Sequence, residues 1–306
     1  MMQSTYTWTG RVDGTTPEHL RFHQVINQSE QAEYTLLGFC SDEGVIRNKG
    51  RQGAALAPNT IRQQLASLPI HQAISIKDGG NIICQEGKLE QAQTELAQKI
   101  TATLLSTSRP IVLGGGHEVA YGSFMGVFHY LQQISPKAKL GIINFDAHFD
   151  LRQADRSTSG TPFLQAAKYS LAHQSPFHYF CLGIAKHGNT KVLFDTADQL
   201  GCQYVYDYEI NHQNLSAIQK KLADFIDAMD MLYVTVDLDV FHSAIAPGVS
   251  APAVRGVDLV CFETLFQQIK QSQKICLLDI AECNPHYDID NRTAKLAAYI
   301  VYQYLT

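Results

Sequence analysis

Residues 140–150 read LGIINFDAHFD, and the predicted fold follows from this stretch. Residues 140–145 are apolar almost throughout, as expected for a strand that is covered on both faces of a sheet. Directly after them, Asp146, His148 and Asp150 alternate with apolar residues, so a period of two can aim all three side chains to one side. The stretch therefore predicts a buried strand that presents three polar side chains at its carboxyl end.

Short β-rich runs recur along the chain, with helical patterns between them. Apolar residues spaced by three or four predict helices over 89–104 and 215–229. The alternation favours an α/β fold with a mostly parallel sheet between layers of helices, and such folds bind ligands beyond the carboxyl ends of the strands. No linker or repeat divides the chain, so we expect a single domain over 1–306 with long loops at 48–59 and 153–161. The predicted strands are 34–40, 110–113, 140–145, 178–182, 231–236 and 275–279.

The composition argues against several classes of partner. The 306 residues include 24 Lys+Arg and 29 Asp+Glu, and the net charge of -5 gives no electrostatic reason to expect nucleic acid. No apolar run approaches the ~20 residues that span a bilayer, and the start lacks the blocks of a secretion signal, so we expect a cytoplasmic protein without a membrane partner. The 7 cysteines include no CxxC pair and are expected to be reduced thiols.

Two further segments place ligand-type residues after apolar runs. IVLGGGHE ends a predicted strand with three glycines before His117, and VTVDLDVF supplies Asp237 and Asp239 with the same alternation. An unpaired buried charge is very costly, so buried acids and imidazoles need partners, and a metal is the simplest common one. The alternative of solvated loop residues does not explain why they follow the most apolar runs. The candidate metal ligands are His117, Asp146, His148, Asp150, Asp237 and Asp239.

The ligand types indicate the metal. Carboxylate oxygens with two imidazoles and no thiolate suit Mn²⁺ better than a structural zinc, while Fe²⁺ and Co²⁺ are also compatible. Four carboxylates balance the charge of two divalent ions, and such a pair can activate a water molecule near neutral pH. We therefore expect two Mn²⁺ ions per subunit, and no nucleophilic serine or cysteine.

The motifs LGGGH, DAHFD and DLD occur in an order that resembles the three metal-binding signatures of the arginase (ureohydrolase) superfamily. The resemblance extends from WTGRVDG and NKGRQGAALAPNTIR to LLDIAECNP near the end. It implies an α/β/α sandwich and a homo-oligomer, a trimer or a hexamer. It also implies that one ion is bound by His117, Asp146, Asp150 and Asp237, and the other by Asp146, His148, Asp237 and Asp239.

Within the superfamily, WTGRVDG, GGGHE, SGTPF and APGVSAPA resemble the formimidoylglutamases. Arg152 stands where arginases have Asn, and Ser159 where they have a proton-shuttling His. Arg152 suits an acidic substrate, although an exposed loop Arg is as often a solvated surface residue. By resemblance, Glu282 accepts hydrogen bonds from the amidine or guanidine group of the substrate. The predicted substrate-binding residues are Arg152, Ser159, Asn189 and Glu282, with Thr190 beside them.

The resemblance implies a hydrolase that splits N-formimidoyl-L-glutamate into L-glutamate and formamide in histidine degradation. Glu282 would hold the amidine, and Asp150 would help to move a proton to the leaving nitrogen. An agmatinase or another guanidino-acid hydrolase is the alternative enzyme, and it would release urea. A metal-binding relative without turnover is the alternative of another class, but its usual mark is a lost ligand. A single-zinc deacetylase-like enzyme would not need the full set of ligands.

Overall fold

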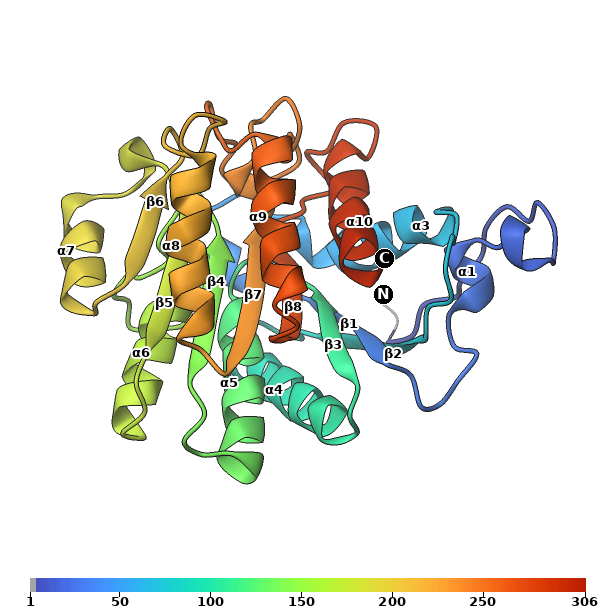
Figure 1. Ribbon diagram of the computed structural model, residues 1–306, viewed down its shortest axis with the longest axis horizontal. Helices are drawn as coiled ribbons and strands as arrows, with labels where there is room; N and C mark the ends of the chain where they lie inside the picture. Colours follow the sequence, from blue (N-terminus) through green and yellow to red (C-terminus); the bar gives the residue numbers. More distant parts are fainter. Residues whose placement is uncertain (1–3) are drawn as a thin grey trace.

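The computed structural model describes residues 4–306, so the first three residues of the predicted domain lie outside the described residues. The described chain forms an 8-stranded sheet with the strand order β2-β1-β3-β8-β7-β4-β5-β6. Every pair of neighbouring strands is parallel, and helices cover both faces (Figure 1). The predicted α/β/α sandwich with a mostly parallel sheet is therefore confirmed.

Six of these strands coincide with the predicted runs, and several extend them by one or two residues. The two strands that the sequence did not predict, β2 and β6, are the two edges of the sheet. Both are only partly buried and carry polar residues, so neither shows the continuous apolar run of a covered strand. The strands are β1 Tyr34–Cys40, β2 Ile76–Ile83, β3 Arg109–Leu113, β4 Leu140–Phe145, β5 His178–Ile184, β6 Gln203–Tyr206, β7 Met231–Asp237 and β8 Ile275–Ala281.

The helices form one layer on each face of the sheet. One layer contains α3, α8, α9 and α10, and the other contains α4, α5, α6 and α7. None of the described helices combines the length and the apolar character needed to cross a bilayer. The helices are α1 Phe22–Val25, α2 Glu43–Arg47, α3 Ala57–Ala66, α4 Leu89–Leu105, α5 Val119–Ile134, α6 Pro162–Ala172, α7 Lys191–Gln199, α8 Leu215–Asp227, α9 Leu259–Gln271 and α10 Arg292–Leu305.

The two predicted loops differ in outcome. Residues 153–161 contain no helix or strand, as expected. The predicted loop at 48–59 is wrong at its end, because a short 3-10 helix, Ala54–Leu56, leads directly into α3 at Ala57. Pro58 suggested a loop, but proline is well tolerated in the first turn of a helix, where its missing N–H has no partner to lose.

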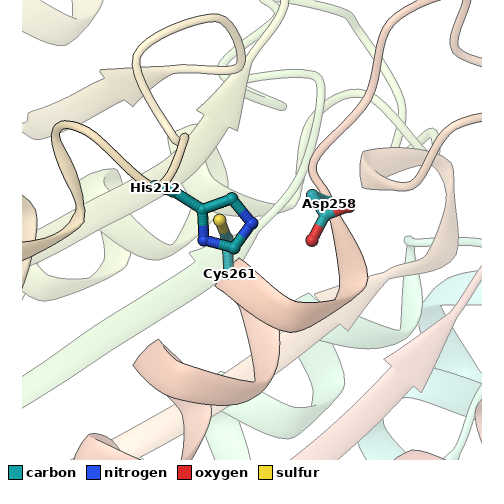
Figure 2. Close-up of side chains that lie close together, drawn as sticks. All are labelled: His212, Asp258 and Cys261. Atoms are coloured by element: carbon teal, nitrogen blue, oxygen red, sulfur yellow. The ribbon is translucent and has the colours of Figure 1, made fainter.

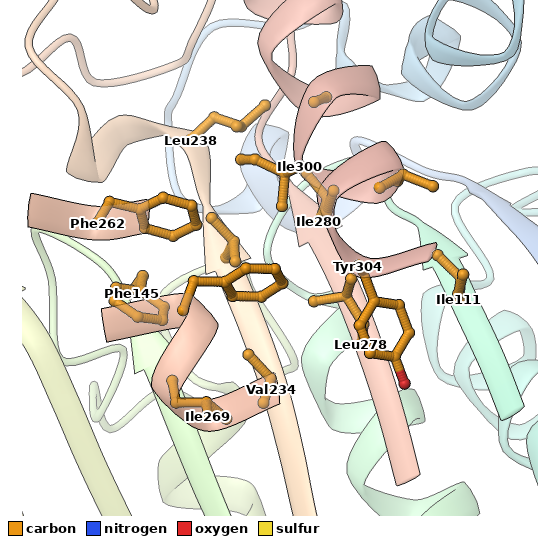
Figure 3. Close-up of a cluster of buried hydrophobic side chains, with 14 of the residues drawn as sticks. Ile111, Phe145, Val234, Leu238, Phe262, Ile269, Leu278, Ile280, Ile300 and Tyr304 are labelled. Atoms are coloured by element: carbon orange, nitrogen blue, oxygen red, sulfur yellow. The ribbon is translucent and has the colours of Figure 1, made fainter. Parts of the chain in front are cut away.

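Alternation along the strands divides the core into two apolar layers. In β7, Val234 faces the layer of α9 and α10, whereas Tyr233 faces the opposite layer. Figure 3 shows Phe262 of α9 and Ile300 of α10 packed over Val234 and Ile280 of the central strands. The central strands are thus buried on both faces, and this packing fixes the position of the carboxyl ends from which the polar residues project.

Candidate metal centre

Four adjacent central strands, β3, β8, β7 and β4, bring the predicted ligands to one edge of the sheet. His117 follows β3, Asp146 follows β4, Asp237 is the last residue of β7, and Glu282 follows β8. Because all four strands are parallel, their carboxyl ends lie at the same edge. Side chains from positions as far apart as 117 and 282 therefore converge above the centre of the sheet.

The first cluster, here called the deep ligand group, consists of His117, Asp146, Asp150 and Asp237. The Nδ1 atom of His117 lies 3.0 Å from Oδ2 of Asp146, 2.9 Å from Oδ2 of Asp150 and 3.1 Å from Oδ2 of Asp237. The His117 side chain is only 1% exposed. One buried nitrogen is thus surrounded by three carboxylate oxygens.

The second cluster, the outer ligand group, consists of Asp146, His148 and Asp239. The Nδ1 atom of His148 lies 3.1 Å from Oδ2 of Asp239 and 3.5 Å from Oδ1 of Asp146. Asp146 belongs to both groups and lies between them. Asp237, which the resemblance assigns to both ions, joins only the deep group, and its Oδ1 accepts a hydrogen bond from the Asp239 backbone N–H at 2.8 Å.

The deep ligand group fits a metal ion better than a set of hydrogen bonds. A ring N–H points in one direction, so it cannot serve three carboxylates, and within residues 4–306 the His117 Nδ1 atom makes no well-formed hydrogen bond. Ligand atoms on adjacent corners of an octahedral ion are roughly 3 Å apart, as these atoms are. Burial and the charge of Asp146 raise the pKa of Asp150 to about 6, and burial with Asp239 and Asp146 raises the pKa of Asp237. This crowding of negative charge is relieved by cations.

Neighbouring side chains hold the ligands in orientation. The Nε2 atom of His117 lies 3.0 Å from the hydroxyl of Thr235, which turns Nδ1 toward the carboxylates. Asn144 donates to Oδ2 of Asp146 at 2.9 Å and to the Tyr179 hydroxyl, also at 2.9 Å. These supports are buried and come from the strands themselves, so the ligand positions are fixed before an ion binds.

A pocket of about 280 Å³ opens directly onto both groups. The four predicted substrate-binding residues all line it, whereas Thr190 does not. Glu282 lies at its buried end, with one carboxylate oxygen accepting from the His117 backbone N–H at 3.0 Å and the other without a hydrogen-bond partner among the described residues. Burial, together with the nearby Glu118, raises the pKa of Glu282 to about 8. Glu282 is therefore a free acceptor that a cationic group would stabilise in its ionised form.

Arg152 and Lys49 are the cationic side chains among the described lining residues, and both form no ion pair within residues 4–306. Lys49 was not identified as a site residue from the sequence, although it lies in the predicted loop at 48–59. Three other cations, Arg156, Lys186 and Arg255, do not line the pocket. Arg152 and Lys49 thus supply the positive charge of the described pocket lining.

The other two predicted substrate-binding residues, Ser159 and Asn189, already make hydrogen bonds within the protein. The Ser159 hydroxyl accepts a hydrogen bond from the Asn48 side chain at 3.1 Å but keeps its own proton available. Asn189 donates to the carbonyl groups of Ala147 and Ala185, both at 2.9 Å, and accepts from the Phe149 N–H. Both amide hydrogens of Asn189 are therefore occupied, and the geometry favours a role in holding the loop that carries His148.

Three residues that line the pocket have left-handed backbone conformations. Their φ angles are +62° for Lys49, +50° for Asp150 and +65° for Glu282. This region is unfavourable for residues with a Cβ atom, and such residues persist where the surrounding structure holds them. The backbone at these positions aims the side chains into the pocket at a conformational cost.

Comparisons with known proteins agree with this geometry. The model of the "Arginase family" matches residues 32–306. The chain is 47% identical to a formimidoylglutamase of Aliivibrio fischeri over 325 residues, covering 97% of this chain and 93% of the relative. It is 44% identical to a formimidoylglutamase of Chromobacterium violaceum over 299 residues, covering 96% of each chain.

Solved structures share the fold. The structure of formimidoylglutamase from Bacillus subtilis superposes with a TM-score of 0.81 at 23% identity and covers 100% of this chain and 95% of its own. Trypanosoma cruzi formiminoglutamase with Mn2+2 superposes with a TM-score of 0.79 at 23% identity and covers 91% of this chain and 94% of its own. The described chain thus has a known fold.

Proposed function

We propose an activity for this chain, which belongs to the arginase family of hydrolases: the hydrolysis of N-formimidoyl-L-glutamate to L-glutamate and formamide, a step of histidine degradation. The observation that carries the proposal is the polarity of the pocket. The lining carries a carboxylate with an unpartnered oxygen, Glu282, and two cations, Arg152 and Lys49. This arrangement matches a small molecule with an amidine at one end and carboxylates at the other.

We propose that the cofactor is a pair of Mn²⁺ ions. The deep ligand group would hold one ion and the outer ligand group the other, with Asp146 shared between them. The oxygen-rich ligands with two imidazoles suit Mn²⁺, and a related structure contains this metal. When bound, the ions would supply an activated water molecule and stabilise negative charge that develops at the reacting carbon.

Glu282 would bind the amidinium group. Glu282 lines the pocket with one oxygen unpartnered among the described residues, and the opposite charge of the substrate would offset the burial that raises its pKa. The other oxygen is held by the His117 backbone N–H, so the carboxylate has a fixed position beside the deep ligand group. This places the amidine carbon next to the ligands, where water can attack it.

The reaction requires one proton to reach the leaving nitrogen. Water adds to the amidine carbon, the bond from this carbon to the α-nitrogen of glutamate breaks, and that nitrogen gains a proton. Asp150 lines the pocket, and a carboxylate at this position can accept a proton from water and release it again. Asp150 would therefore carry the proton from the attacking water to the leaving nitrogen.

Arg152 and Lys49 would bind the glutamate carboxylates and repel a cationic substrate such as agmatine. The test is an assay of the manganese-loaded protein with N-formimidoyl-L-glutamate, agmatine, arginine and guanidinobutyrate, with formamide and urea measured as products. We expect formamide from the first substrate and little urea from the others. Urea from agmatine without formamide would instead favour an agmatinase and overturn the proposed substrate.

The Arg152→Ala variant tests how the acidic end is recognised. The loss of a charge-assisted hydrogen bond should lower kcat/KM for formimidoylglutamate roughly thirtyfold. This corresponds to a loss of about 2 kcal/mol of transition-state stabilisation. Metal content should stay unchanged, because Arg152 belongs to neither ligand group. Arg156→Ala is the matched control, since this cation lies outside the pocket, and it should leave the kinetics as they are. If Arg152→Ala behaves like this control, Lys49 becomes the main carboxylate-binding residue.

A further inference from the structure

A second cluster of metal-ligand side chains lies away from the pocket described above. Figure 2 shows His212, Asp258 and Cys261 close together. His212 lies in the loop that follows β6, whereas Asp258 and Cys261 lie at the start of α9. The three side chains thus join two segments that are more than forty residues apart in the sequence.

The geometry of the cluster is that of a mixed-ligand site. One ligand atom of each residue lies within 4.8 Å of those of the other two. Asp258 and Cys261 are three residues apart, a spacing that places both on one face of the helix start, and Figure 2 shows the His212 ring across from them. Ligand atoms around a tetrahedral ion are closer, so binding would draw them together by about 1 Å. The side chains of His212 and Asp258 are exposed and free to make this movement.

The ligand atoms are largely unused within residues 4–306. One oxygen of Asp258 accepts a hydrogen bond from the Val260 N–H at 2.9 Å, which leaves the other oxygen available. No hydrogen bond or ion pair engages the His212 ring, and no hydrogen bond engages the thiol of Cys261. Cys261 is fully buried, yet its Sγ atom lies within 4.8 Å of a ligand atom of His212 and of Asp258.

The cluster also borders a space that can admit an ion. A cavity of about 480 Å³ is lined by His212, Asp258 and Cys261 together with Asp207, His242 and Arg255. Water can therefore reach the exposed side chains of His212 and Asp258 and complete the coordination of an ion that the protein binds with three ligands. This cavity shares no lining residue with the pocket that contains Glu282.

We propose that His212, Asp258 and Cys261 form a separate site for Zn²⁺, with water at the fourth position. A thiolate with an imidazole and a carboxylate is a ligand set typical of zinc, whereas the oxygen-rich deep and outer ligand groups suit Mn²⁺. Binding replaces the thiol proton of Cys261 with the metal and releases that proton to water. The two kinds of site would thus select different metals, because their ligand atoms differ.

The site would connect the loop after β6 to the start of α9. The segment before α9 is itself anchored, because bridges join Phe241 to Val257 and His242 to Ala253. This segment carries Ser250, which lines the pocket with Glu282. Zinc at Asp258 would therefore stabilise one end of a segment that forms a wall of that pocket, without a ligand in the pocket itself.

Cobalt is a suitable probe, because Co²⁺ bound to a thiolate gives a charge-transfer absorption in the near ultraviolet. We expect this absorption when one equivalent of Co²⁺ is added to the manganese-loaded protein, and its loss when Zn²⁺ is then added. His212→Ala should abolish the signal while it keeps all seven cysteines, and Cys261→Ser should do the same. Cys202→Ala removes a partly buried thiol outside the cluster, so it serves as the control and should keep the signal.

Zinc retained after dialysis gives a second readout that does not depend on hydrolysis. We expect one equivalent in the wild-type protein and roughly 100-fold weaker binding in His212→Ala, since a direct ligand is lost. His212 is exposed on a loop, so this variant should fold normally, and circular dichroism checks this. Absence of the cobalt signal, or an equal signal in His212→Ala, would overturn the proposed zinc site. Neither result bears on the proposed hydrolysis.

Discussion

The deep and outer ligand groups share Asp146 but differ in their surroundings. In the deep group, three carboxylates surround one nitrogen of His117, whose side chain is 1% exposed. In the outer group, two carboxylates face His148, whose side chain is 26% exposed. The deep group also has a hydroxyl behind its histidine, at Thr235. The difference indicates that the deep site is more rigid and more negative, and that an ion in the outer site exchanges more easily.

The largest expected effect comes from the residue that both groups share. Asp146→Asn replaces a carboxylate with a weakly ligating amide, so it should weaken the binding of both metal ions. Turnover should fall by at least roughly 1,000-fold, which corresponds to about 4 kcal/mol in the activation barrier. The fold should survive, because the amide is similar in size. Metal analysis and kinetics check this prediction, and near-normal turnover with two bound equivalents would contradict the shared position.

Asp237→Asn sharpens the same prediction. If Asp237 binds both ions, as the family resemblance implies, its variant should lose both metals as Asp146→Asn does. If it serves the deep group alone, as the side-chain geometry suggests, one equivalent should remain in the outer site. Metal titration of the two variants side by side distinguishes these outcomes.

His148→Ala should affect one ion only. The loss of a direct ligand from the outer group should lower the affinity for that ion by more than ~100-fold. This is above the range expected for the loss of a residue that only hydrogen-bonds to a ligand. The metal content should therefore fall from two equivalents to one at limiting Mn²⁺, and activity should recover in part at high Mn²⁺. Loss of both ions would show that the two sites are not independent.

Glu282→Gln tests an acid that belongs to neither group. Turnover should fall by roughly tenfold or more, in line with the 1.5–3 kcal/mol of a hydrogen bond to a charged group. Both metal equivalents should remain. Loss of metal would identify Glu282 as a ligand or as a support of the His117 backbone, to which it is bonded.

Thr235→Val should have the smallest effect. It removes the hydroxyl that orients His117, so the affinity of the deep ligand group for its ion should fall about tenfold. The affinity of the outer ligand group should stay unchanged. Isothermal titration of the metal-free protein measures both affinities. Equal weakening of both ions would mean that Thr235 stabilises the sheet and not the histidine.

The sequence predicted the centre of the molecule better than its edges. Central strands such as β4 and β7 are continuous apolar runs, so a chain pattern alone locates them. The edge strand β2 reads IKDGGNII, is paired with a neighbouring strand on one side only and is only partly buried, so it carries no such pattern. The same contrast applies to the site. Asp146, His148 and Asp150 follow a strand with a period of two, whereas Lys49 reaches the pocket through a left-handed loop residue that periodicity cannot locate.

The left-handed backbone at Asp150 and Glu282 has a consequence for protein engineering. Glycine relieves the conformational cost of such positions, so Asp150→Gly and Glu282→Gly should gain stability from the backbone while they remove groups proposed to act on the substrate. A library that is selected for heat resistance alone would therefore drift toward inactive variants at these codons. Selection for activity has to accompany selection for stability, and β-branched residues should be rare among the survivors at both positions.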